Sequence, residues 1–151
     1  MQTTITFIHL LSLVCWIGSI VFFSFFTAPA VFTTLGREQG GEMMSVLFPR
    51  YYGLGYVCSV LAAATLLLSP MGATGLRLPF LIGMAACTLY AGLVISPSAR
   101  AVKKQMKDEP ENRETLEPRF QSLHAWSVRL NATVLILGLG LLWLTAAHFQ
   151  S

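Results

Sequence analysis

The sequence predicts an all-α fold: an integral membrane four-helix bundle with an interfacial amphipathic helix between the first and second spans. Two observations lead to this prediction, namely the composition and the length of the apolar segments. The 151 residues are 54% hydrophobic and only 11% charged, with a mean hydropathy of +0.63, whereas soluble domains carry about 25% charged residues. One soluble core of this size could not bury so much apolar surface, so we expect lipid around it.

Four apolar segments define the predicted spans within a single domain, residues 1–151. Each has the roughly 17–25 residues that a spanning helix needs, and charge is nearly absent from them except for Arg129. A strand interpretation fails because the runs are too long and do not alternate. Helices satisfy their own backbone groups in hydrocarbon. The predicted spans are residues 5–28, 51–69, 78–96 and 125–147.

The first apolar segment could instead be a cleaved signal peptide, because Ala28-Pro29-Ala30 resembles a small-residue cleavage site. Two features argue against this alternative. Residues 1–6 contain no Lys or Arg, and the apolar run is longer than the usual 7–15 or so residues. We therefore expect a helix of the mature protein.

The three connections differ in character. In residues 32–48, apolar residues recur at helical spacing around Gly40-Gly41, which predicts the interfacial helix. Residues 70–77 form a short turn. In the long polar stretch, residues 98–107 continue the third helix with basic residues, residues 108–112 form a turn, and Glu117-Pro118 is typical of a helix N-terminus.

The cations predict the orientation. Outside the spans, one side of the predicted bundle carries only Arg77, and the other carries Arg37, Arg50, Arg100, Lys103, Lys104, Lys107, Arg113 and Arg119. The positive-inside rule then places the loop of about residues 98–123 in the cytoplasm and both termini outside. The net charge of +3 is explained by attraction to membrane lipid, so no nucleic-acid partner is expected.

Two spans carry polar stripes that we take as candidate site residues. Polar side chains in membrane helices normally face the bundle interior, where they form a site or bond neighbouring helices. We expect the stripe of the fourth span to face the first span and Arg129 to point away, toward headgroups. The stripe residues are His9, Ser12, Trp16 and Ser19 in the first span, and His124, Ser127 and Asn131 in the fourth.

Cofactors are not expected, although two alternatives stay open. Cys15, Cys58 and Cys87 all lie near mid-membrane depth, where three thiols could hold a soft metal ion, or could simply pack as small apolar groups. Haem b could be held by His9 and another axial group, but not by His9 together with His124, since these lie at opposite depths. We predict no catalytic residues, because no nucleotide-binding loop, metalloprotease motif or nucleophile elbow is present.

Several stretches resemble a known group of proteins. His9-Leu10-Leu11, Trp16-Ile17-Gly18, Ala28-Pro29-Ala30-Val31-Phe32 and Leu47-Phe48-Pro49-Arg50-Tyr51-Tyr52 resemble small four-helix bacterial membrane proteins known as a domain of unknown function. That group is similar to the eukaryotic transmembrane protein two hundred and five, associated with platinum-drug tolerance. His9 and the following Trp-x-Gly give a more distant likeness to copper-resistance D and HemJ-type proteins.

The resemblance implies a bacterial inner-membrane protein without a settled activity. Our leading interpretation is a non-enzymatic membrane protein that handles a small solute or metal ion or contributes to tolerance. The alternatives are an accessory subunit of a larger membrane complex and a haem-binding redox protein that uses His9. Four helices leave little room for an internal path, so a transporting form would be a homo-oligomer.

Overall fold

A computed structural model describes residues 1–69 and 75–148, and the regular elements in these ranges are all helical. In chain order, these are the α-helix α1 (Gln2–Phe22), the π turn η1 (Phe23–Thr27), α2 (Ala28–Leu68), α3 (Arg77–Tyr90), the π turn η2 (Ala91–Ile95), α4 (Ser96–Asp108), the 3₁₀ turn η3 (Pro110–Asn112) and α5 (Arg113–His148). The prediction of an all-helical protein is therefore confirmed.

Within the described ranges, three helices are long and apolar enough to cross a membrane, Gln2–Leu68, Arg77–Asp108 and Pro110–Ala147. The sequence predicts four spans because residues 5–28 and 51–69 are counted separately. In the structure both lie in the single long helix Gln2–Leu68, which is interrupted at Gly36 by a non-helical backbone with φ 74° and ψ −176°. This conformation is essentially open to glycine alone, and the chain reverses there.

The reversal at Gly36 corrects the prediction of a separate interfacial helix over residues 32–48. The chain continues the first arm as far as Leu35 and starts back along the second arm from Arg37. The predicted break at Gly40-Gly41 is helical instead. A side-chain carbon added at Gly40 would lie 2.9 Å from Cδ1 of Phe32, so this glycine permits close packing across the reversal.

The second half of the chain confirms one predicted extension and corrects one predicted helix start. α4 extends the third predicted span as far as Asp108, and η3 supplies the predicted turn. α5, however, begins at Arg113 and contains Pro118 in its second turn. Proline is tolerated near a helix start, because the first N–H groups of a helix have no intrahelical partner.

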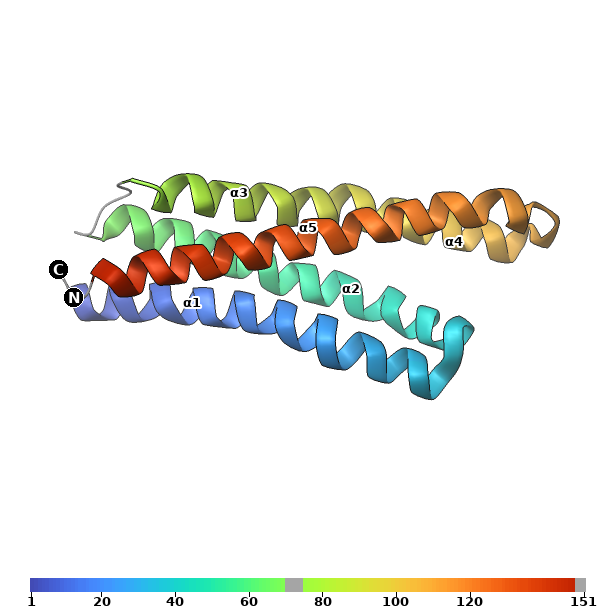
Figure 1. Cartoon of the computed structure of the whole chain (residues 1–151), viewed down its shortest axis with the longest axis horizontal. Coiled ribbons are helices and arrows are strands. Elements are labelled where there is room, and N and C mark those ends of the chain that lie inside the picture. Colours follow the sequence, from blue (N-terminus) through green and yellow to red (C-terminus); the bar gives the residue numbers. More distant parts are fainter. Residues whose placement is uncertain (70–74, 149–151) are drawn as a thin grey trace.

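The helices form two hairpins that lie side by side (Figure 1). The first hairpin is Gln2–Leu68, with arms on either side of Gly36, and the second is residues 77–148. The N-terminus and the last turn of α5 lie at one end of the molecule, here called the terminal end. The bend within the long helix Gln2–Leu68 and the connection between α4 and α5 lie at the other, the turn end. The core between the arms is apolar and includes Leu13, Trp16, Ala62, Met84 and Leu141.

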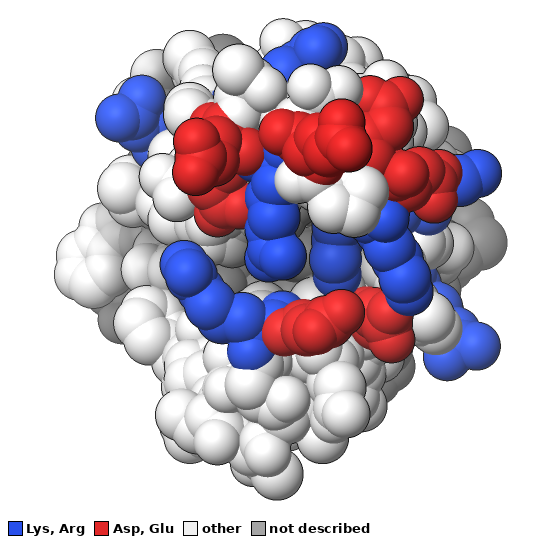
Figure 2. Space-filling view, turned by 90° about the vertical axis from the view of Figure 1, so that its right-hand side faces the viewer, with Lys and Arg blue, Asp and Glu red and all other residues white. Residues whose placement is uncertain are grey.

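The charged residues gather at the turn end. Figure 2 shows this end with acidic groups above and below a row of Lys and Arg side chains. Nζ of Lys107 donates to Oε1 of Glu42 at 2.8 Å, which joins the two hairpins. This hydrogen bond and the charge of Lys107 hold the pKa of the Glu42 carboxyl below its usual range and raise the pKa of Lys107. Burial of the Lys103 ammonium against Gly41 lowers the pKa of Lys103.

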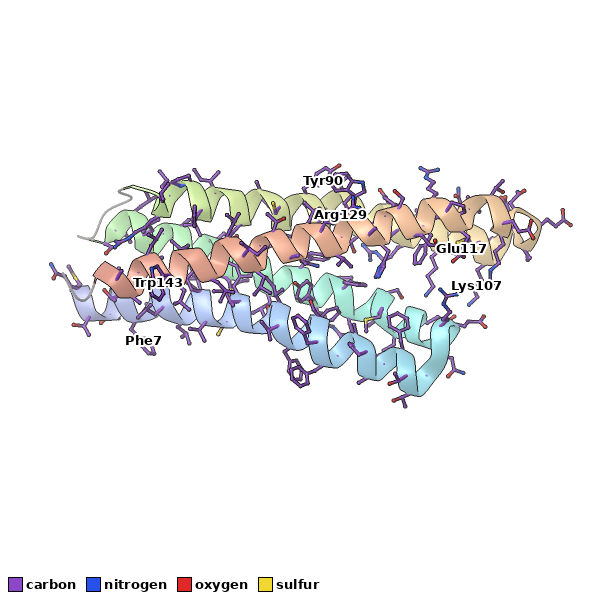
Figure 3. All side chains as sticks on the ribbon, viewed as in Figure 1. Phe7, Tyr90, Lys107, Glu117, Arg129 and Trp143 are labelled. Atoms are coloured by element: carbon purple, nitrogen blue, oxygen red, sulfur yellow. The ribbon has the colours of Figure 1, made fainter. Side chains whose placement is uncertain are left out.

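Large apolar side chains cover the outside of the hairpins. Figure 3 labels two of them near the terminal end, Phe7 and Trp143, and Trp143 is 75% exposed. Arg129 and Tyr90 lie on the outside farther along. The Arg129 guanidinium carbon is 5.8 Å from the ring centroid of Trp126, so Arg129 points outward as predicted. An apolar exterior is the surface that lipid requires.

Candidate functional site

Four polar side chains are buried together at the terminal end, and each comes from a different helix. His9 belongs to α1, Thr65 to α2, Arg77 to α3 and Thr145 to α5. All four are among the buried polar residues of the protein, with His9 6% exposed and Arg77 8% exposed. Polar and ionisable groups are costly between membrane helices, which makes this cluster the candidate site.

His9 is held by a hydrogen bond to the neighbouring helix. Its Nδ1 lies 3.0 Å from Oγ1 of Thr65. The single hydroxyl hydrogen of Thr65 is directed at backbone carbonyl oxygens of its own helix, 2.6 Å from Leu61 and 3.1 Å from Ala62. When the hydroxyl donates to the Leu61 carbonyl, the Thr65 oxygen can accept a hydrogen bond from Nδ1 of His9.

Arg77 places a positive charge inside the bundle. Its Nη2 donates to the carbonyl oxygen of Leu144 at 3.3 Å, in the last turn of α5. A cation is favourable at a helix C-terminus. The ion pair that the structure shows in the described ranges is Lys107 with Glu42, at the turn end. All seven Asp and Glu residues of the chain lie between Glu38 and Glu117, so no side-chain carboxylate belongs to the terminal end.

A small cavity lies within this cluster. Its volume is about 10 Å³, which is about the space that one water molecule needs. The lining combines hydroxyl groups, the imidazole, the guanidinium and one apolar side chain. The lining residues are Thr6, His9, Leu66, Ser69, Arg77 and Thr145. The cavity can therefore take a single water molecule or a small ion, and a larger solute does not fit.

The two hairpins contribute equivalent positions to the cavity. His9 lies fourteen residues before the start of η1, and Arg77 lies fourteen residues before the start of η2. Pro29 lies six residues after the start of η1, and Pro97 lies six residues after the start of η2. Proline has no N–H donor for an α-helical bond, so a π turn ahead of each proline has a common local cause. Each hairpin thus presents one basic side chain from its first arm.

The remaining polar residues of the first span have local partners. The hydroxyl of Ser12 donates to the carbonyl of His9 and that of Ser19 to the carbonyl of Trp16, both at 2.7 Å. His9, Ser12 and Trp16 are buried and Ser19 is half-buried, so the predicted stripe does lie on the inner face. Only His9 of this set lines the cavity.

The stripe of the fourth span is divided. Asn131 accepts from the Tyr51 hydroxyl at 3.1 Å, and the Ser127 hydroxyl lies 3.0 Å from that of Tyr52. Both residues therefore pair with the second arm of the first hairpin, whereas the sequence predicts pairing with the first span. His124 is exposed, which corrects the prediction that it faces the bundle. Nearer the turn end, α5 runs beside α4 (Figure 1).

The three cysteines do not form a metal site in the described structure. Cys15 is exposed, Cys58 is buried and Cys87 is half-buried. Among the side chains described in residues 1–69 and 75–147, no three of His, Cys, Asp or Glu are close enough together to hold a metal ion. Similar depth does not bring thiols together when they lie on different faces of their helices.

The surroundings of His9 do not fit a haem. Pockets for molecules of that size class have volumes of about 300–1,000 Å³, and the cavity beside His9 has about 10 Å³. His124 lies 21 residues before Thr145, which lines the cavity together with His9, and this separation is about 32 Å along α5 at 1.5 Å per residue. We therefore derive no reaction step through a haem.

Sequence reasoning identifies His9 and misses Arg77 and Thr65. Arg77 is the only cation outside the spans on its side of the predicted bundle, and this isolation is the signal that could have marked it. In the sequence-based prediction, Arg77 is only one of the cations that are counted to assign the orientation. Thr65 has no distinguishing pattern, because threonine inside a membrane helix usually bonds to its own backbone.

The fold and the cluster define a protein with apolar membrane-type helices and a buried basic cavity at one end. The chain belongs to the family described as "Domain of unknown function (DUF4149)", whose profile matches residues 11–108. It is also similar to an uncharacterized protein of Aquifex aeolicus (strain VF5), with 46% identity over 48 residues. That match covers 32% of this chain and 35% of the relative's length. No solved structure matches the chain.

Proposed function

We propose that this protein crosses a bacterial inner membrane four times, with both termini outside, and binds a small inorganic anion in the cavity between His9 and Arg77. The reversal at Gly36 supports four crossings, because each arm of the long helix Gln2–Leu68 contains one predicted span. The gathering of cations at the turn end supports a cytoplasmic location for that end. The terminal end, with the cavity, then faces outward.

One observation carries the binding proposal: the buried Arg77 lies beside His9 in a cavity without a side-chain carboxylate. A buried charge is costly unless it is paired and hydrogen-bonded. The Leu144 carbonyl supplies one partner through a dipole only. An anion in the cavity would neutralise the guanidinium and accept hydrogen bonds from the surrounding hydroxyl groups.

The cavity volume limits the ligand class. About 10 Å³ accommodates a species close to water in size, so chloride is a suitable probe and an organic anion is not. This proposal specifies the interpretation that the protein handles a small solute. The cytoplasmic charged end could additionally bind lipid headgroups, as polybasic surfaces do.

The test measures the thermal unfolding of the purified protein in detergent as sodium chloride replaces sodium gluconate at constant ionic strength. We expect a saturable rise in the unfolding temperature, because a ligand that binds only the folded state stabilises it, by about 2.7 kcal/mol at one hundred times Kd. Arg77→Gln should abolish the rise. Arg129→Gln is the matched control, since Arg129 is exposed and distant from the cavity, and it should retain the rise.

Two results would contradict the proposal. One is an unfolding temperature of the unmodified protein that does not depend on chloride. The other is an equal chloride dependence in Arg77→Gln and in Arg129→Gln. The broadening of the ³⁵Cl NMR line by the unmodified protein gives a second measurement that does not depend on the stability of either variant.

A further inference from the structure

We infer that His9 takes up a proton at Nε2 when the anion binds, so that the cavity binds an anion and a proton together. The inference rests on the proposed anion site and adds a proton to its ligand. It follows from the hydrogen bonds that fix the imidazole, together with the position of the ring beside Arg77 in the cavity lining.

The tautomer of His9 is set by Thr65. A hydroxyl has one hydrogen, and that of Thr65 is directed at the Leu61 carbonyl, with an oxygen–oxygen distance of 2.6 Å. With the hydrogen placed there, the Thr65 oxygen accepts from the imidazole, and in the inferred site the neutral ring carries its hydrogen on Nδ1. Nε2 of the neutral ring then carries a lone pair and no hydrogen.

The free nitrogen lies on the opposite edge of the ring from Thr65. Thr65 does not line the cavity, whereas His9 does. We therefore assign the edge of the ring opposite Thr65, which carries Nε2, to the cavity. A lone pair repels an anion, and an N–H attracts one. Neutral His9 therefore opposes an anion at Arg77, and imidazolium His9 donates to it.

The anion and the proton each make the binding of the other more favourable. Without an anion, a second positive charge on His9 would face Arg77 across the same small cavity, and like charges disfavour each other. With a monovalent anion between them, one proton taken from the outside water accompanies one negative charge, and the net charge of the site does not change. The transfer makes an Nε2–H bond and breaks an O–H bond of a hydronium ion or water.

No carboxylate is among the described residues that line the cavity with His9. Thr6, Ser69 and Thr145 contribute hydroxyl groups, Leu66 is apolar and Arg77 is a cation. Beside the cavity, His9 also has Thr65 and the backbone of Ala62 as hydrogen-bond partners. A guanidinium group is not deprotonated in proteins, so among the side chains described in residues 1–69 and 75–147 the imidazole of His9 is the group lining this cavity that can take up a proton.

The first test measures chloride binding between about pH 5 and pH 8. We expect the Kd for chloride to weaken up to about tenfold per pH unit where His9 is neutral, because each anion then needs one proton. His9→Gln puts an amide in place of Nε2, so its chloride binding should not depend on pH. His124→Gln is the matched control, as His124 is exposed at the other end, and it should keep the pH dependence.

The second test observes the proton directly. In the double variant His124→Gln/His148→Gln, His9 is the only histidine left. Its ¹⁵N spectrum at about pH 8 in gluconate should show a protonated Nδ1 and a bare Nε2. Chloride at about pH 6 should protonate both nitrogens.

The outcomes separate the two proposals. Chloride binding that does not depend on pH, or a neutral ring with its hydrogen on Nε2, would overturn the coupled proton and leave the anion site standing. The absence of chloride binding at every pH would overturn both. A pH dependence that persists unchanged in His9→Gln would assign the proton to another group and would also overturn this inference.

Discussion

At the residue scale, the hydrogen-bond partner of a polar side chain between these helices indicates its role. The side chain either contributes only to helix packing or can also bind a ligand. Ser12 and Ser19 donate to carbonyls of their own helix, which satisfies them without any neighbour. Asn131 accepts from Tyr51 across helices, as packing contacts in membranes commonly do. His9 and Arg77 differ because each has a partner and also borders a cavity.

The sequence could predict part of this site for a physical reason. His9 stands out because imidazole is rare inside an apolar run. Arg77 lies where an apolar run begins, a position typical of a cation that reaches the headgroups. Only the packing of α3 against the end of α5, through the Leu144 carbonyl, shows that Arg77 is buried.

Replacing Thr65 tests whether its hydroxyl group holds the His9 imidazole in place through their hydrogen bond. Thr65→Val keeps the shape and removes the acceptor, which leaves a buried donor without its partner at a cost of about 1–3 kcal/mol. The measurement is the free energy of unfolding in mixed micelles with increasing SDS. Thr33→Val is the control, since Thr33 is exposed and donates only to its own helix, and it should change the value by less than about 0.5 kcal/mol. Equal effects of the two substitutions would show that the Thr65 hydroxyl does not hold His9.

At the element scale, the long helix Gln2–Leu68 shows what periodicity can and cannot predict. Apolar spacing predicts helix on both sides of Gly36, and helix is present on both sides. The place of the reversal depends on which glycine adopts a positive φ and which permits close packing. Gly36 adopts the positive φ, and Gly40 permits the close packing. The sequence alone does not distinguish these two glycines.

The reversal can be tested with a pair of alanine substitutions in the same helix. Gly36→Ala places a side chain at φ 74° and ψ −176°, which should cost about 1–3 kcal/mol of unfolding free energy. Gly53→Ala adds a carbon with no neighbour within 4 Å and should stabilise the helix by up to about 1 kcal/mol. Unfolding followed by far-UV circular dichroism gives both values. If Gly36→Ala left the free energy of unfolding unchanged, the chain would not reverse at Gly36.

At the scale of the whole molecule, the distribution of charge relates the fold to the membrane. The helix Arg77–Asp108 has 32 residues, about 48 Å at 1.5 Å per residue, whereas the hydrocarbon core is about 30 Å thick. The surplus lies at the turn end, where α4 carries its basic residues. In the proposed orientation, the hairpins would therefore project from the membrane on the side that holds most cations. This asymmetry is readable from the sequence, because it needs only a count of cations beside apolar runs.

The orientation is tested by single cysteines placed at the two ends. In a background with Cys15, Cys58 and Cys87 replaced by alanine, Gln2→Cys and Asn112→Cys introduce exposed thiols at the terminal end and the turn end. An impermeant maleimide on intact spheroplasts should label Gln2→Cys at once and Asn112→Cys only after permeabilisation, because the cation-rich end stays in the cytoplasm. The reverse order of labelling would invert the molecule and place the His9–Arg77 cavity on the cytoplasmic side. Labelling of both from the same side would contradict the crossing of the membrane between them.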